Sequence, residues 1–118
     1  MSHIAKIDIQ FKDITCIITT AKRLNYKCEK VTKFKFYDGT NATGTAVYLP
    51  NWRYPVVIKE DGEAVFDNYN GNWGDQEYLN GFKQIYGVET AKKQARIKGY
   101  SCREVQLEDG RIKLFVST

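Results

Sequence analysis

The chain has 118 residues, of which 42% are hydrophobic and 27% charged, and a formal net charge of +4. These values are typical of one soluble globular domain. No apolar run approaches the ~18 residues that span a bilayer, and the N-terminus lacks a signal-peptide core. The composition excludes a collagen-like, a disordered and a membrane-spanning chain, and it predicts a single cytoplasmic domain over residues 1–118 with no membrane partner.

Hydrophobic periodicity predicts an alternation of strands and helices. A half-buried strand has apolar residues at every second position, whereas an amphipathic helix has them every three or four positions. In chain order we expect a strand at 4–11, a helix at 14–24, one or two strands at 26–37, a short strand at 45–49, a hairpin at 56–59 and 64–66, a helix between 75 and 99, and a terminal hairpin at 100–107 and 112–116.

Both expected helices have end signals in the sequence. Asp13 and Asp75 carry side chains that can cap the helix N-termini, and Asn25 and Gly99 suit the residue after a helix C-terminus. Gly87 is expected to interrupt the second helix.

Turn residues divide the expected strands. Asp-Gly pairs at 38–39, 61–62 and 109–110 predict tight turns. Residues 40–44 are expected to form a polar loop, and residues 67–74 an Asn- and Gly-rich loop that carries Tyr69 and Trp73.

One internal similarity links the two helix ends. Residues 21–31 align with residues 95–105, and alanine, a basic residue, tyrosine, cysteine and valine recur in register. One interpretation is shared helix-exit chemistry, in which the tyrosine fills the seam between helix and sheet. The other is a pair of pseudo-duplicated helix–strand units. Either way we expect an α+β fold, with two or three helices on one face of a mainly antiparallel sheet.

The chain offers little chemistry for catalysis or metal binding. Its three cysteines, Cys16, Cys28 and Cys102, are odd in number and widely spaced, which suits neither a disulfide framework nor a zinc site. We expect them to be reduced and mostly buried. The sole histidine, His3, has no predictable catalytic partner, and no nucleotide-loop or hydrolase motif occurs. The sequence therefore predicts no enzyme, no cofactor and no metal.

The first candidate binding segment combines lysines with aromatic residues. Residues 1–60 contain ten basic and five acidic residues, whereas residues 61–118 contain eight and nine. Within the basic half, Lys33 and Lys35 alternate with aromatic residues up to Tyr37. Aromatic planes beside ammonium groups suit a ligand with both a base and a phosphate. The alternative is a strand with its aromatic face in the core and its lysines in water.

The second candidate is the loop formed by Trp52, Arg53 and Tyr54. Proline residues bracket it at positions 50 and 55, so it should present three large side chains with limited flexibility. Trp, Tyr and Arg are the residue types enriched in binding hot spots. The alternative is a loop that packs back over the edge of the sheet.

Several short motifs together resemble one family. They are the opening residues 1–7, Leu24-Asn25-Tyr26, Asp67-Asn68-Tyr69, Trp73-Gly74, Tyr78-Leu79-Asn80, Gln84-Ile85-Tyr86, Gly99-Tyr100 and residues 108–114. The chain resembles the Ycf-thirty-five-like proteins, a domain-of-unknown-function family of plastids, cyanobacteria, other bacteria and tailed phages. The resemblance is weakest over residues 31–55. It implies no established activity and no catalytic residues. The Lys- and aromatic-rich middle and the high Asn, Lys and Tyr content resemble a phage member.

These observations predict a non-catalytic, phage-encoded binding protein. It would recognise an anionic, nucleotide-type ligand and could sequester a host signal, with Lys33, Lys35, Tyr37, Trp52, Arg53 and Tyr54 as ligand-binding residues. The alternative is a protein–protein adaptor or inhibitor of a host enzyme, since genes of cellular relatives often lie near those of AAA+ ATPases. Nucleic-acid binding is a second alternative, less favoured because +4 is a modest charge for that task. An unpaired edge strand leaves a homodimer open.

Overall fold

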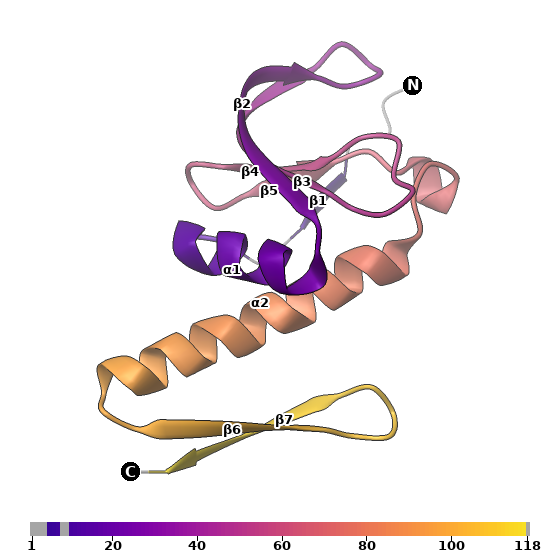
Figure 1. Cartoon of the computed structure of the whole chain (residues 1–118). Coiled ribbons are helices and arrows are strands. Elements are labelled where there is room, and N and C mark those ends of the chain that lie inside the picture. Colours follow the sequence, from indigo (N-terminus) through magenta and orange to yellow (C-terminus); the bar gives the residue numbers. More distant parts are fainter. Residues whose placement is uncertain (1–4, 8–9, 118) are drawn as a thin grey trace.

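The computed structural model describes residues 5–7 and 10–117 and shows an α+β fold in layers. A five-stranded sheet forms one layer, two α-helices lie against one of its faces, and a separate two-stranded hairpin lies against the second helix (Figure 1). All described strand pairs are antiparallel. The α+β class and the helices on one sheet face are thus confirmed. His3 and part of the first expected strand lie outside the described residues.

The larger sheet has the strand order β1-β5-β4-β3-β2. Its strands are β1 (Ala5–Ile7), β2 (Lys27–Lys35), β3 (Asn41–Tyr48), β4 (Val56–Lys59) and β5 (Ala64–Phe66). The prediction of a polar loop at 40–44 was wrong for residues 41–44, because this polar stretch pairs with β2 on one side and, at Gly44, with β4 on the other. Hydrogen bonding to two neighbours outweighs its weak strand propensity.

Both helices begin and end at the predicted residues. The Asp13 side chain accepts a hydrogen bond from the backbone of Cys16 and so caps α1 (Ile14–Leu24). The Asp75 side chain similarly caps α2 (Gln76–Ile97). The expected interruption at Gly87 is wrong, since α2 continues through it. Helix α2 packs into the main core with the sheet and α1 and also contacts the hairpin, and this packing outweighs the cost of one glycine.

The main core fills the space between the sheet and the two helices. Helix α1 contributes Ile17 and Ala21, and α2 contributes Leu79, Phe82 and Tyr86. A smaller cluster lies on the opposite face of the sheet and consists of Phe36, Ala42, Ala46, Val57 and Val65. Of the three free cysteines only Cys16 is buried; the other two are half-buried.

The two aligned helix ends share one hydrogen-bond pattern. The Tyr26 N–H donates to the Ala21 carbonyl at 2.8 Å, and the Tyr100 N–H donates to the Ala95 carbonyl at 2.9 Å. Asn25 and Gly99 supply the left-handed residue of this helix end, with φ values of 62° and 80°. The strands that follow belong to different sheets. The two helix ends therefore share their exit chemistry, but Tyr26 packs against the main core whereas Tyr100 is 36% exposed.

The three Asp-Gly pairs form the same kind of hairpin turn. In each turn the aspartate side chain accepts a hydrogen bond from the backbone N–H two residues later, at 2.9–3.1 Å. The glycine that follows has a φ of 88° in all three, a value that only glycine adopts without strain. The three turns predicted from these pairs are confirmed.

Ion pairs connect α1, α2 and the hairpin. Arg23 of α1 lies 2.8 Å from Glu104 of strand β6 (Ser101–Gln106) and 3.1 Å from Glu89 of α2. Lys92 lies 3.0 Å from Glu104. Hydrogen bonds from Arg23, and secondarily from Lys92, lower the pKa of Glu104 from 4.5 to about 2.

This lowered pKa predicts an acid-sensitive contribution to stability. A carboxylate whose folded-state pKa lies below its unfolded value stabilises the fold above the unfolded pKa, and this contribution is lost as the pH falls from about 4.5 to 2. Glu104 is partly exposed, so we expect it to account for about 1–2 kcal/mol after screening. Urea unfolding between pH 7 and pH 2 should show a shallower acid decline for Glu104→Gln than for the wild type. Parallel declines would contradict this role.

Candidate functional site

An aromatic cluster with one arginine gathers side chains from three loops of the larger sheet. We call Tyr37, Arg53, Tyr54, Tyr69 and Trp73 the Trp73 patch. The three tyrosine rings have centroids 4.9–5.9 Å from the Trp73 ring, and the Arg53 guanidinium carbon lies 4.5 Å from it. A cation over an aromatic ring at this distance is attracted by the negative face of the ring.

Three separate loops bring these side chains together. Tyr37 lies between β2 and β3, Arg53 between β3 and β4, and Trp73 between β5 and α2. The backbone N–H of Arg53 donates to the Trp73 carbonyl at 2.8 Å, so the second and third loops are fixed to each other. Tyr37 remains 62% exposed at the edge of the patch. The backbone therefore fixes Arg53 and Trp73 relative to each other, and the ring of Tyr37 beside Trp73 is accessible to a ligand.

The third loop has a strained backbone. Tyr69 and Asn70 have φ values of 48° and 53°, in the left-handed region that residues with a side chain seldom adopt. The buried Asp67 side chain accepts a hydrogen bond from the Tyr69 N–H at 3.1 Å through Oδ1, whereas its Oδ2 has no hydrogen-bond partner in the described structure. The strain is localised at a residue whose ring contacts Trp73, as is common at binding sites.

Of the predicted loop residues, Trp52 lies apart from the patch. Its ring packs 5.7 Å from Phe66 at the rim of the main core, and its indole N–H donates to the Asp75 carbonyl at 3.0 Å. A Cβ at Gly74 would lie 2.4 Å from the indole, so glycine is required there. Trp52 thus packs back over the sheet, and substituting it would disturb the fold as well as any ligand.

The predicted lysines lie on the strand that leads into the patch. Lys33 and Lys35 are exposed, and Lys33 occupies an irregularity in β2 with a φ of 52°, where its N–H donates to the Thr43 hydroxyl. Phe36 is buried, and Phe34 contacts both Phe36 and Tyr54. The segment is therefore a strand with aromatic residues packed on the protein and lysines in water, as the alternative interpretation predicted.

The sequence named Tyr69 and Trp73 only as loop residues and did not assign them to a site. Nothing in their spacing connects them with Tyr37 or Arg53, which lie 16 or more residues away. The asparagine- and glycine-rich stretch around them indicated a loop with unusual backbone angles, and that signal was correct.

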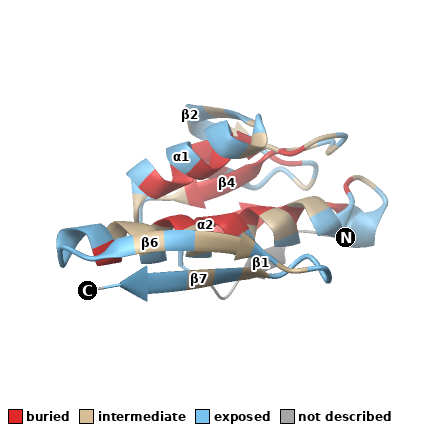
Figure 2. Ribbon diagram, turned by 60° about the horizontal axis from the view of Figure 1, so that its bottom comes forward, coloured by how far each residue is buried: buried red, intermediate tan, exposed pale blue. Residues whose placement is uncertain are grey.

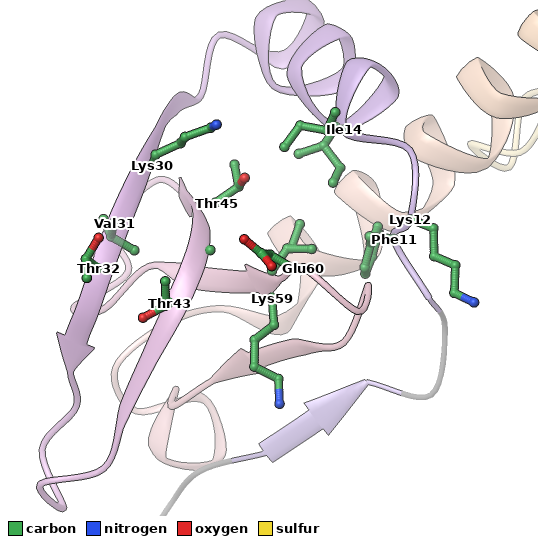
Figure 3. Close-up of a pocket in the computed structure, with 13 residues that line it drawn as sticks. Phe11, Lys12, Ile14, Lys30, Val31, Thr32, Thr43, Thr45, Lys59 and Glu60 are labelled. Atoms are coloured by element: carbon green, nitrogen blue, oxygen red, sulfur yellow. The ribbon is translucent and has the colours of Figure 1, made fainter.

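A cavity of about 270 Å³ lies elsewhere, between the start of α1, the middle of β2 and β3 and the end of β4 (Figure 3). The Lys30 ammonium group points into it, whereas Lys12 and Lys59 point away. The Glu60 carboxylate also lies at the cavity. One cation beside one carboxylate gives no net positive charge, so this cavity is a poor phosphate site.

Among residues 5–7 and 10–117, no three His, Cys, Asp or Glu side chains come close enough to hold a metal ion. No helix in the same part of the chain has the length and apolar character needed to cross a membrane.

No family model, curated protein or solved structure matches this chain. The resemblance to the Ycf-thirty-five-like proteins therefore stays a prediction.

Proposed function

We propose that this protein is a non-catalytic binding protein whose Trp73 patch recognises an anionic, nucleotide-type ligand. The Arg53 guanidinium, 4.5 Å from the Trp73 ring that the exposed Tyr37 also contacts, carries the proposal. A nucleotide offers a planar base and a phosphate, and the patch offers a partner for each.

The two halves of such a ligand have different partners. A base can stack on an exposed aromatic ring, and stacking contributes about 1–3 kcal/mol per base. Arg53 supplies a planar guanidinium, which binds phosphate oxygens through two parallel hydrogen bonds. Lys33 and Lys35 are exposed on the adjoining strand and add positive charge on that side.

The test is titration of the protein with ATP, GTP and their monophosphates, followed by tryptophan fluorescence and calorimetry. We expect stacking to quench the Trp73 emission and Arg53→Ala to weaken binding about tenfold or more, the loss of one charged contact. Failure of all four nucleotides to bind, or equal affinities for Arg53→Ala and wild type, would contradict the proposal.

Lys27 provides a matched control. Its ammonium group lies 5.2 Å from the centroid of the Tyr48 ring and forms the same type of cation–aromatic pair outside the patch. Lys27→Ala removes one positive charge, as Arg53→Ala does. Because Lys27 lies outside the Trp73 patch, its loss should leave nucleotide affinity unchanged. An equal loss in Lys27→Ala and Arg53→Ala would indicate a general charge effect instead of a site.

Binding of a protein partner is the second candidate function, and one observation favours it. The Trp73 patch lines none of the cavities of about 270, 310 and 500 Å³ found among the described residues. Trp, Tyr and Arg gathered on a surface outside these cavities are typical of a protein–protein hot spot. Under this function, immobilised wild-type protein should retain one stoichiometric protein from a lysate, and the Arg53→Ala variant should not.

A further inference from the structure

The C-terminal hairpin is poorly covered by the rest of the chain. It consists of β6 and β7 (Ile112–Ser117), and each of its described residues is half-buried or exposed (Figure 2). A two-stranded hairpin is only marginally stable by itself. The radius of gyration is 15.3 Å, whereas a compact domain of this length has about 13.5 Å. The chain is therefore less compact than a typical domain, and among the described residues the hairpin packs mainly on α2.

Two edge strands of this protein differ in how they are protected. β2 carries four lysines and an irregularity in its pairing, which are common devices against edge-to-edge association. β7 pairs with β6 in an unbroken register and carries one lysine in the sequence IKLFVS. Phe115 and Val116 of β7 remain 39% and 49% exposed. An apolar edge that lacks these protective devices is a template for another strand.

We propose that β7 pairs antiparallel with β7 of a second copy, about a two-fold axis that passes beside Leu114. In this register Leu114 lies opposite itself, Ile112 opposite Val116, and Lys113 opposite Phe115. Ile112, Leu114 and Val116 share one face of the hairpin, so the pairing forms a continuous apolar row. On the other face each lysine meets an aromatic ring, as Lys113 already does within one chain at 5.0 Å.

The outer edge of β6 is unsuited to the same pairing. A two-fold axis perpendicular to the sheet places residues of the same face opposite each other. An axis at Arg103 would place Arg103 against itself, and an axis at Glu104 would place Glu104 against itself. Like charges directly opposite each other destabilise a sheet. Axes at Cys102 and Val105 avoid like charges but form no continuous apolar row. The axis at Leu114 of β7 does both, so β7 is the favoured pairing edge.

The resulting dimer completes a layer that one chain leaves unfinished. Two hairpins joined through β7 form a four-stranded sheet, and α2 of each copy lies against one face of it. Two helices on a four-stranded sheet are a common two-layer arrangement. Because the same edge is used in both copies, the contact closes at two chains.

The first test is the mass of the protein in solution, measured by sedimentation and native mass spectrometry. We expect twice the chain mass of 13.6 kDa. In the Phe115→Lys variant, Lys113 of each copy lies opposite the new lysine of the other copy. The dimer then contains two such like-charge pairs, so dimer affinity should fall about tenfold or more. Adding Lys113→Glu to this variant should restore the dimer through Glu–Lys pairs. A wild-type monomer at every concentration, or a dimer that Phe115→Lys leaves intact, overturns the proposal.

Two controls separate pairing from folding. Val105→Lys adds the same charge on β6, opposite Lys113 of its own hairpin. Because β6 lies away from the two-fold axis, this variant should leave the dimer intact. Leu114→Cys should be cross-linked to its copy by a short bis-maleimide, above the level that the native cysteines give in the wild type. Val105→Cys, three strands from its copy, should not. Cross-linking at Val105 in place of Leu114 overturns the register.

Discussion

Replacing Gly44 with alanine is expected to lower the free energy of unfolding by about 3 kcal/mol or more. Gly44 lies in β3 between Val31 of β2 and Lys59 of β4. A Cβ at this position would lie 2.1 Å from the backbone carbonyl oxygen of Ile58, a distance that no neighbouring side-chain movement can relieve. The strands must separate locally, and hydrogen bonds of the sheet are lost. Urea unfolding at one protein concentration measures the change.

Gly81 supplies the matched control for the same substitution. It lies in the interior of α2, and a Cβ there meets nothing within 4 Å. Gly81→Ala should therefore raise the free energy of unfolding by about 0.5–1 kcal/mol through helix propensity alone. The two alanine variants should thus move the urea midpoint in opposite directions. A Gly44→Ala variant as stable as the wild type would show that β3 is not held between β2 and β4.

Features decided by neighbouring residues were predictable from the sequence. Asp13 and Asp75 cap their helices, and Asn25 and Gly99 end them, because a cap depends on a few consecutive residues. The Asp-Gly turns follow from the same local chemistry. In contrast, the start of β3 at Asn41 could not be predicted, because its polar residues become strand only through pairing with β2 and β4.

The candidate site was predictable only in part for the same reason. The sequence identified Tyr37, Arg53 and Tyr54 by residue type, and the structure brings them to one surface. Trp73, the residue at its centre, was not assigned to a site, because three loops meet there only after the sheet has formed. Trp52 has the same residue type, yet its ring packs toward the core. Residue type indicates which side chains can bind a ligand. Only the tertiary fold decides which of the two tryptophans reaches the surface patch.

Helix α2 is the layer on which the sheet and the hairpin both depend. Leu79, Phe82 and Tyr86 face the main core. Ile85, which is buried outside that cluster, lies seven residues before Lys92, and Lys92 contacts Glu104 of the hairpin. Residues seven apart share one face of a helix, so Ile85 lies on the hairpin side. Packing on both sides explains why a helix with two glycines and many charged residues is continuous.

We therefore expect Leu79→Ala to have the other large effect on stability. Leu79 is 1% exposed at the centre of the main core, and removing three carbon atoms there leaves a cavity between α2 and the sheet. Such substitutions cost about 3–5 kcal/mol. Ile97→Ala in the same helix is the control, because Ile97 is 68% exposed and its loss should change stability by about 0.5 kcal/mol or less. Urea unfolding at one protein concentration compares the two. Equal losses would mean that α2 is not packed against the sheet through Leu79. A loss confined to Leu79→Ala would place the main core between α2 and the larger sheet.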